Sequence, residues 1–161
     1  NSAGIERFPD YQYDMVRLGI GLYGISPVTG EMLHNVSSLK TTILQIREVE
    51  EGMSIGYSRR TRVSRRSRIA AIPIGYADGL SRHLGNRKGY CLVGGRKASY
   101  VGNICMDVCM LDVTDIPCQP GDEVEVFGDN LPVTVLSDLL DTIPYEVLTS
   151  VSERVKRVYF Q

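Results

Sequence analysis

A tyrosine beside a run of arginines is the part of this sequence whose residue types most directly suggest chemistry. Tyr57 follows Gly56, and residues 59–68, RRTRVSRRSR, contain six arginines in ten positions. Two interpretations are open: the arginines bind a polyanion, or they surround a reactive phenol. A free tyrosine has a pKa of about 10, so a tyrosine base working near neutral pH needs cationic or hydrogen-bonded surroundings.

The charge of the whole chain does not favour a nucleic-acid-binding protein. The 161 residues carry a formal net charge of −1, so the arginine run is local and is offset by acidic residues elsewhere. A protein that works mainly on nucleic acid usually has an overall basic excess. We expect the run to be mostly solvated surface, with dimer contacts or steering of an anionic substrate as alternatives.

The cysteines and histidines do not have the spacing of a metal site. The four cysteines are Cys91, Cys105, Cys109 and Cys118, and the two histidines are His34 and His83. No pair of cysteines forms a CxxC motif, so we predict no metal and reduced, largely buried thiols in a cytoplasmic protein. No apolar stretch approaches the length of a membrane span, and no segment has the pattern of a signal peptide.

Short apolar segments separated by turn residues predict a mainly β domain. We expect strands within residues 14–27, 38–50, 68–79, 89–101, 103–114 and 120–128. Gly94 and Gly95 suit the tight turn of a hairpin, because glycine adopts positive φ angles readily. Strands of this number and spacing are typical of a barrel or a sandwich.

Helices are expected only near the end of the chain. Residues 137–143 begin with Ser137, a good N-cap residue, and residues 144–155 begin with Pro144, which suits the first helical position. The last residues, KRVYF, can return as a strand. The chain starts with Asn1 rather than Met, so we expect it to be part of a longer protein.

Four stretches together resemble the C-terminal part of the bacterial alanine racemases. They are NSAGIERFPDYQYDMVRLGIGLYGISP (1–27), GYSRRTRVSRRSRIAAIPIGYADG (56–79), VGNICMDVCM (101–110) and TIPYEVLTSVSERVKRVY (142–159). The resemblance covers nearly the whole chain but less than half of a typical member, whose N-terminal part is a β/α barrel carrying pyridoxal 5'-phosphate (PLP). It implies that residues 1–30 are the end of that barrel. Residues 31–161 would form the family's C-terminal β-barrel-like domain, with short helices near its end.

The resemblance also implies a set of cofactor-binding residues. Those that match positions meeting the PLP phosphate are Ser2, Gly19, Ile20 and Tyr145. Arg17 matches the arginine that donates a hydrogen bond to the pyridine nitrogen. Because arginine does not give up its proton in a protein, it would keep that nitrogen unprotonated and make the ring a weaker electron sink. A weak sink suits an enzyme that only moves one proton.

The catalytic base implied by the resemblance is Tyr57, which would remove the α-proton of L-alanine. The cofactor lysine, which lies outside these residues, would remove the α-proton of D-alanine from the opposite face. The backbone N–H of Met106 would meet the substrate carboxylate, and Tyr76 and Asp107 match positions that line the approach. In this family the site is shared across a homodimer, so Tyr57 and Met106 would enter the partner's site. The product would be D-alanine for peptidoglycan.

The chain departs from the family pattern at two positions. Ser58 follows Tyr57 where the family usually has glycine, and Asn103 stands where many members have arginine, two residues before the CMD cysteine. Because the cofactor lysine is absent, we predict that the chain alone is inactive. Three alternatives stay open: a racemase of another amino acid such as serine, a polyanion-binding β domain, and a non-catalytic dimerisation module.

Overall fold

The computed structural model describes residues 1–160, and its contacts divide the chain into two compact units, residues 1–38 and 39–161. The boundary that the sequence predicts between the two units, residue 30, lies inside the first of them. The assignment of the first unit to the end of a β/α barrel stays a prediction. None of the helices in the described residues has both the length and the apolar character needed to cross a membrane.

The first unit is built from short helices joined by irregular segments. These are α1 (Ser2–Arg7), the 3₁₀ helices η1 (Pro9–Tyr11) and η2 (Ile20–Tyr23), and an isolated bridge between Ile25 and Met32. The strand expected within residues 14–27 is therefore wrong. A strand needs a hydrogen-bonded partner along its length, and this unit supplies none beyond that bridge. Gly24, with φ of 74°, also ends η2 in a left-handed conformation.

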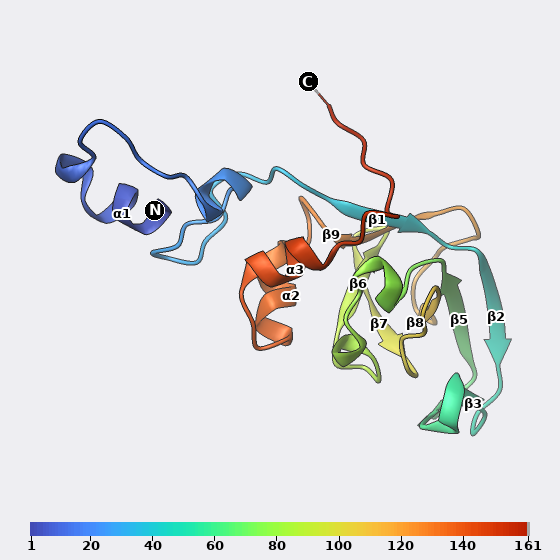
Figure 1. Ribbon diagram of the computed structural model, residues 1–161. Coiled ribbons are helices and arrows are strands. Elements are labelled where there is room, and N and C mark those ends of the chain that lie inside the picture. Colours follow the sequence, from blue (N-terminus) through green and yellow to red (C-terminus); the bar gives the residue numbers. More distant parts are fainter. Residues whose placement is uncertain (161) are drawn as a thin grey trace. The chain divides into compact units, whose positions relative to one another are not determined.

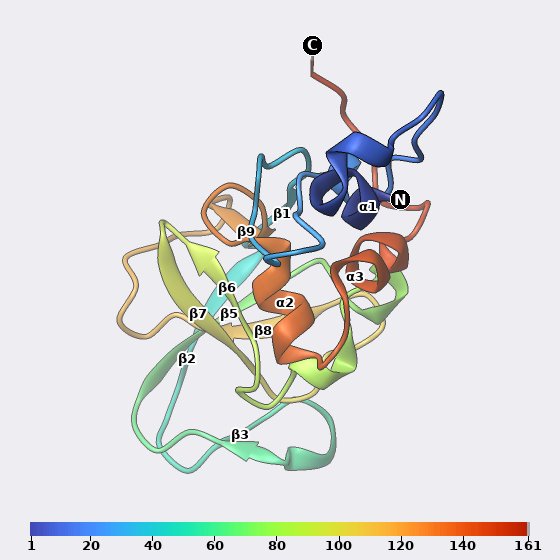
Figure 2. The ribbon, with the colours of Figure 1, turned by 90° about the vertical axis from the view of Figure 1, so that its left-hand side faces the viewer.

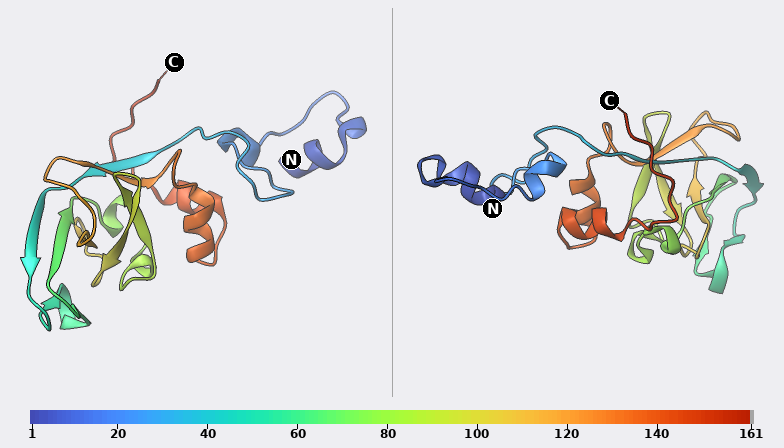
Figure 3. Two further views of the ribbon diagram at one scale, coloured as in Figure 1. Left: turned by 180° about the vertical axis from the view of Figure 1, so that it is seen from behind. Right: turned by 45° about the horizontal axis from the view of Figure 1, so that its top comes forward.

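The second unit is built around one antiparallel sheet of seven strands. Its strands are β1 (Leu39–Thr42), β2 (Gln45–Val49), β5 (Ser67–Ile72), β6 (Tyr90–Val93), β7 (Arg96–Val101), β8 (Cys109–Asp112) and β9 (Glu123–Phe127). They are ordered β1-β9-β6-β7-β8-β5-β2. Only Ile43 and Leu44 separate β1 from β2 along the chain, yet these strands lie at opposite ends of that order. The sheet must therefore curl until its edges approach, as Figures 1 and 3 show.

Local sequence signals and burial explain the sheet. Gly94 and Gly95 have φ angles of 55° and 75°, so the tight hairpin predicted between β6 and β7 is confirmed. The segment 38–50, expected as one strand, is divided at Ile43, whose side chain is buried. The core consists of apolar side chains from β1, β5, β6, β7, β8 and β9, including Ile72, Val93, Leu111 and Val124, whereas β2 has no buried side chain. The predicted mainly β, barrel-like domain is therefore what the chain forms.

Two α-helices follow the last strand and pack side by side (Figures 1 and 2). α2 (Val133–Leu139) begins four residues before the Ser137 start that we expected. Ser137 therefore lies inside the helix, where its hydroxyl donates to the Thr134 carbonyl instead of capping the helix. α3 (Pro144–Ser150) begins at Pro144 as predicted but ends five residues early. The expected final strand does not form in residues 156–160.

Candidate functional site

The predicted base, Tyr57, lies on a tight turn between two very short strands. β3 (Ser54–Ile55) and β4 (Thr61–Arg62) pair with each other, and the 3₁₀ turn η3 (Tyr57–Arg59) joins them. The Tyr57 side chain is 75% exposed. Its hydroxyl makes no hydrogen bond to any residue in the described part of the chain. The phenol is therefore presented outward on a turn, as a base acting on an external substrate requires.

The backbone of this turn explains why the family usually has glycine after the tyrosine. Ser58 has φ of 64° and Arg59 has φ of 49°, both in the left-handed region that favours glycine. Gly56, with φ of 71° and ψ of −173°, has a conformation open essentially to glycine alone. Ser58 therefore adopts a conformation that costs more for serine than for glycine.

Residues 102–107, in the loop between β7 and β8, bring several predicted residues together. Asn103 donates from Nδ2 to the Tyr57 carbonyl oxygen at 3.2 Å. The N–H groups of Tyr76 and Ala77 donate to the carbonyls of Cys105 and Met106, each at 3.0 Å. Tyr57, Tyr76, Met106 and Asp107 therefore belong to segments that meet at this one loop.

An arginine that the sequence did not single out ties this loop to the end of the chain. Arg154 Nε donates to Asp78 Oδ1 at 2.7 Å, and an Arg154 Nη atom donates to Asp107 Oδ1 at 2.6 Å. Asp78 lies on η4 (Tyr76–Asp78), and its other carboxylate oxygen accepts from the Gly75 N–H at 2.8 Å. Asp107 is thus held by Arg154, and its predicted role along the approach to the site stays a prediction.

The hydrogen bonds that Asp78 accepts from Arg154 and Gly75, which we call the Asp78 clamp, are expected to weaken in acid. Burial by itself raises the pKa of Asp78, but the hydrogen bonds from Arg154 and Gly75 outweigh it, and the pKa of Asp78 lies below its ordinary value. A carboxylate with a lowered pKa stabilises the fold above its unfolded pKa of about 3.9, and that stabilisation is lost as the pH falls through the folded pKa.

We expect Asp78→Asn to lower the free energy of unfolding by about 2 kcal/mol at pH 7, the usual contribution of hydrogen bonds to a charged group. The difference from wild type should shrink as the pH drops below about 4. Urea unfolding of both proteins at pH 7 and pH 3 measures this. An equal difference at both pH values would show that the Asp78 charge does not support the clamp.

The arginine run is mostly engaged with neighbouring segments. Arg62 donates to the Gly52 carbonyl, Arg65 pairs with Asp115, Arg66 pairs with Glu48 and Glu50, and Arg68 donates to the Ile116 and Cys118 carbonyls. Arg59 and Arg60 make no ion pair within the described residues. The six arginines therefore do not form one continuous free cationic surface, which disfavours the polyanion interpretation.

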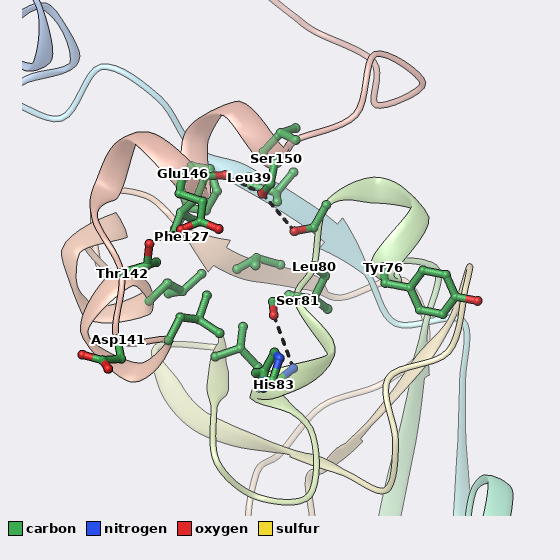
Figure 4. A pocket seen from close by; sticks show the side chains of 17 residues that line it. Leu39, Tyr76, Leu80, Ser81, His83, Phe127, Asp141, Thr142, Glu146 and Ser150 are labelled. Carbon is green, nitrogen blue, oxygen red and sulfur yellow. Dashed lines mark hydrogen bonds between the residues drawn. The ribbon is translucent and has the colours of Figure 1, made fainter.

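A cavity of about 550 Å³ in the second unit lies apart from the Tyr57 turn. It is lined by side chains of α2, α3 and residues 76–84. Tyr76 lies at its edge with the ring extending away from Leu80 and Ser81 (Figure 4). Tyr57 and Met106 do not line it. Tyr145 is on α3, whose last residue, Ser150, donates to the Gly79 carbonyl at 3.1 Å.

The remaining predicted residues are in the first unit, where two of them meet. The buried Ser2 hydroxyl oxygen accepts hydrogen bonds from the N–H groups of Gly19 at 2.9 Å and Gly21 at 3.1 Å. A Cβ atom on Gly21 would lie 3.0 Å from the Leu18 side chain, so the backbone fits closely here. Ile20 follows Gly19 as the first residue of η2.

Arg17 lies at a second cavity, of about 540 Å³, in the first unit. Its guanidinium makes no hydrogen bond or ion pair within the described residues. An arginine with free donors suits recognition of an acceptor group on a bound molecule.

Comparison with known proteins decides the family. A family model described as "Alanine racemase, C-terminal domain" matches residues 36–159. The chain belongs to the alanine racemase family.

Full-length relatives and a solved structure support this assignment. The chain is 41% identical over 169 residues to an alanine racemase from Halothermothrix orenii and 42% identical over 170 residues to one from Sorangium cellulosum. These matches cover 99% of the chain but only 44% and 45% of the relatives. The crystal structure of alanine racemase from Bartonella henselae with covalently bound pyridoxal phosphate matches with a TM-score of 0.93 at 40% identity, over 99% of this chain and 45% of that one. The chain thus spans less than half the length of these alanine racemases.

The residues that sequence reasoning missed are those that hold the candidate site residues in place. Arg154, Asp78 and Asn86 lie in no pattern that marks them, because their partners are distant along the chain. The available signal was the resemblance itself: Asp78 lies within residues 56–79 and Arg154 within residues 142–159, two of the four stretches that carry it.

Proposed function

We propose that this chain is the C-terminal portion of a PLP-dependent alanine racemase, which we call the complete enzyme. It would interconvert L- and D-alanine and supply D-alanine for peptidoglycan in the cytoplasm. The observation that carries the proposal is the loop 102–107, on which the segments bearing Tyr57, Tyr76 and Met106 converge in a member of this family. The relatives are named alanine racemases, and the Bartonella enzyme binds pyridoxal phosphate covalently.

The first unit offers groups that fit the cofactor. The Ser2 hydroxyl oxygen accepts from the N–H groups of Gly19 and Gly21, which fixes the hydroxyl and leaves its own hydrogen to donate to a phosphate oxygen. The unpaired guanidinium of Arg17 suits the pyridine nitrogen. We propose that Ser2, Gly19, Ile20 and Tyr145 hold the phosphate. When bound, PLP supplies the electron sink that makes the α-proton of alanine removable.

The second unit would supply the base and the carboxylate contact. We propose that Tyr57 accepts the α-proton of L-alanine and that the Met106 N–H donates to the substrate carboxylate. Tyr76 and Asp107 would line the approach, and Arg154 would hold Asp107 in place. The exposure of Tyr57 on its own unit supports a site completed by a second copy of the enzyme, so we propose a homodimer in which Tyr57 and Met106 enter the partner's site.

Racemisation assays on the complete enzyme test the proposal. Purified enzyme with PLP should convert L-alanine to D-alanine much faster than free PLP does in buffer. Chiral chromatography measures the two enantiomers. L-serine serves as the competing substrate, and the 161-residue chain alone should give no conversion above free PLP. Faster turnover of L-serine than of L-alanine would move the proposal to another amino acid, and no racemisation of either would overturn it.

A further inference from the structure

Two asparagine side chains connect the loop 102–107 to the turn that carries Tyr57. Asn103 Nδ2 donates to the Tyr57 carbonyl oxygen at 3.2 Å, and Asn103 Oδ1 accepts from Asn86 Nδ2 at 3.1 Å. Thr61 Oγ1 donates to Asn86 Oδ1, also at 3.1 Å, while the Asn86 N–H donates to the Gly102 carbonyl at 2.8 Å. Both ends of the Asn103 amide are therefore engaged, and its partner Asn86 is itself fixed.

The turn itself, residues 57–60, is exposed and extends beyond Ile55, which is buried against Val63, Ile69 and Val101. The strands on either side have two residues each, and the Tyr57 side chain is outside the core. Ser58 and Arg59 both have positive φ angles, and each such residue costs about 1–2 kcal/mol relative to an ordinary conformation. A turn with these features opens unless another segment holds it.

The residue type at position 103 matters for this connection. An arginine, which many family members have there, carries only donors and cannot accept from Asn86 Nδ2. Asparagine offers one acceptor and two donors, and the structure uses both kinds. The bond from Asn86 needs an acceptor at position 103 and the bond to the Tyr57 carbonyl needs a donor, and asparagine supplies both.

We propose that Asn103 is a positioning residue that fixes the turn bearing Tyr57, and through the turn the phenol oxygen. The catalytic consequence rests on the proposed function, because it takes Tyr57 as the base. A displacement of a reacting group by about 1 Å lowers rates by roughly 10²-fold, so a loosened turn should slow proton transfer without altering cofactor binding.

The sharpest variant is Asn103→Asp. It keeps the side-chain shape and the acceptor for Asn86, but it replaces the Nδ2 donor with an oxygen facing the Tyr57 carbonyl. In this variant of the complete enzyme, without substrate, the rate of backbone amide hydrogen–deuterium exchange in residues 55–60 should rise by about tenfold. Mass spectrometry measures that rate. Racemisation should fall by at least about tenfold, with the PLP absorbance spectrum unchanged. Gln119→Glu makes the same kind of change, an amide to a carboxylate, at an exposed residue and should alter neither quantity.

A second variant covers the case in which Asn103→Asp does not fold. Asn86→Gly removes the amide that braces Asn103, while glycine suits the φ of 56° at that position. It should produce the same two changes, each smaller. Unchanged exchange in residues 55–60, or faster exchange with wild-type racemisation, would overturn the positioning role. If the wild-type enzyme does not racemise alanine, the proposed function fails, and the exchange measurement still decides whether Asn103 holds the turn.

Discussion

Replacing Tyr57 by phenylalanine in the complete enzyme is expected to lower racemisation of L-alanine by roughly 10²–10⁴-fold, the usual contribution of a positioned general base. The change removes only the phenol oxygen. That oxygen makes no hydrogen bond within the described residues, and the side chain is 75% exposed. The free energy of unfolding should therefore change by less than about 0.5 kcal/mol, as for most surface substitutions. A large kinetic loss without a stability loss assigns the effect to chemistry.

The same variant should lose proton removal from L-alanine but keep proton removal from D-alanine. In D₂O, exchange of the α-hydrogen of L-alanine should be lost, while exchange of the α-hydrogen of D-alanine should continue, because a different base serves that face. Tyr159→Phe is the matched control, since Tyr159 is 84% exposed and lies outside the proposed site. Equal loss of both exchange reactions, or wild-type racemisation, would show that Tyr57 is not the base for L-alanine.

The parts of the fold that the sequence predicted well are those determined locally. Gly94 and Gly95 between two apolar segments predicted the β6–β7 hairpin, because the positive φ angles of such a turn are a property of two residues. The start of α2 was wrong because Ser137 is a good capping residue, whereas burial of Val133 and Leu136 extends the helix further back. A local propensity was overridden by packing, which one sequence does not reveal.

The same distinction explains the candidate site. Tyr57 and Met106 were found because they lie within stretches that resemble a known family, and their roles remain proposals. The contacts that hold them join residues far apart in sequence: Arg154 reaches back to Asp78 and Asp107, and Asn103 reaches Tyr57. No spacing rule predicts such pairs, since each depends on how the curled sheet brings its loops together.

Gly75→Ala is expected to have the second large effect, because residues 75–77 and the carbonyls of Cys105 and Met106 lie against each other without room for a side chain. A Cβ atom on Gly75 would lie well under 3.0 Å from both carbonyl oxygens, a separation that real Cβ atoms essentially never show. Gly75 itself is extended, with φ of −150°, so the clash and not the backbone angle decides the outcome. Alanine must push the Met106 loop away or break its hydrogen bonds to Tyr76 and Ala77.

We expect this variant to lower the free energy of unfolding by about 3 kcal/mol, at the upper end for overpacked sites. Displacing the Met106 N–H by about 1 Å should also lower kcat/KM for L-alanine by roughly 10²-fold. Gly94→Ala is the control: Gly94 has φ of 55°, but a Cβ atom there would meet nothing within 4 Å, so this variant should be destabilised by about 1–2 kcal/mol and retain activity. Urea unfolding and racemisation kinetics should be measured on both variants. Gly75→Ala reports the effect of a steric clash, and Gly94→Ala reports the effect of backbone strain alone. If Gly75→Ala behaved like Gly94→Ala in both measurements, the close approach of these two loops would not be what holds the proposed carboxylate contact in place.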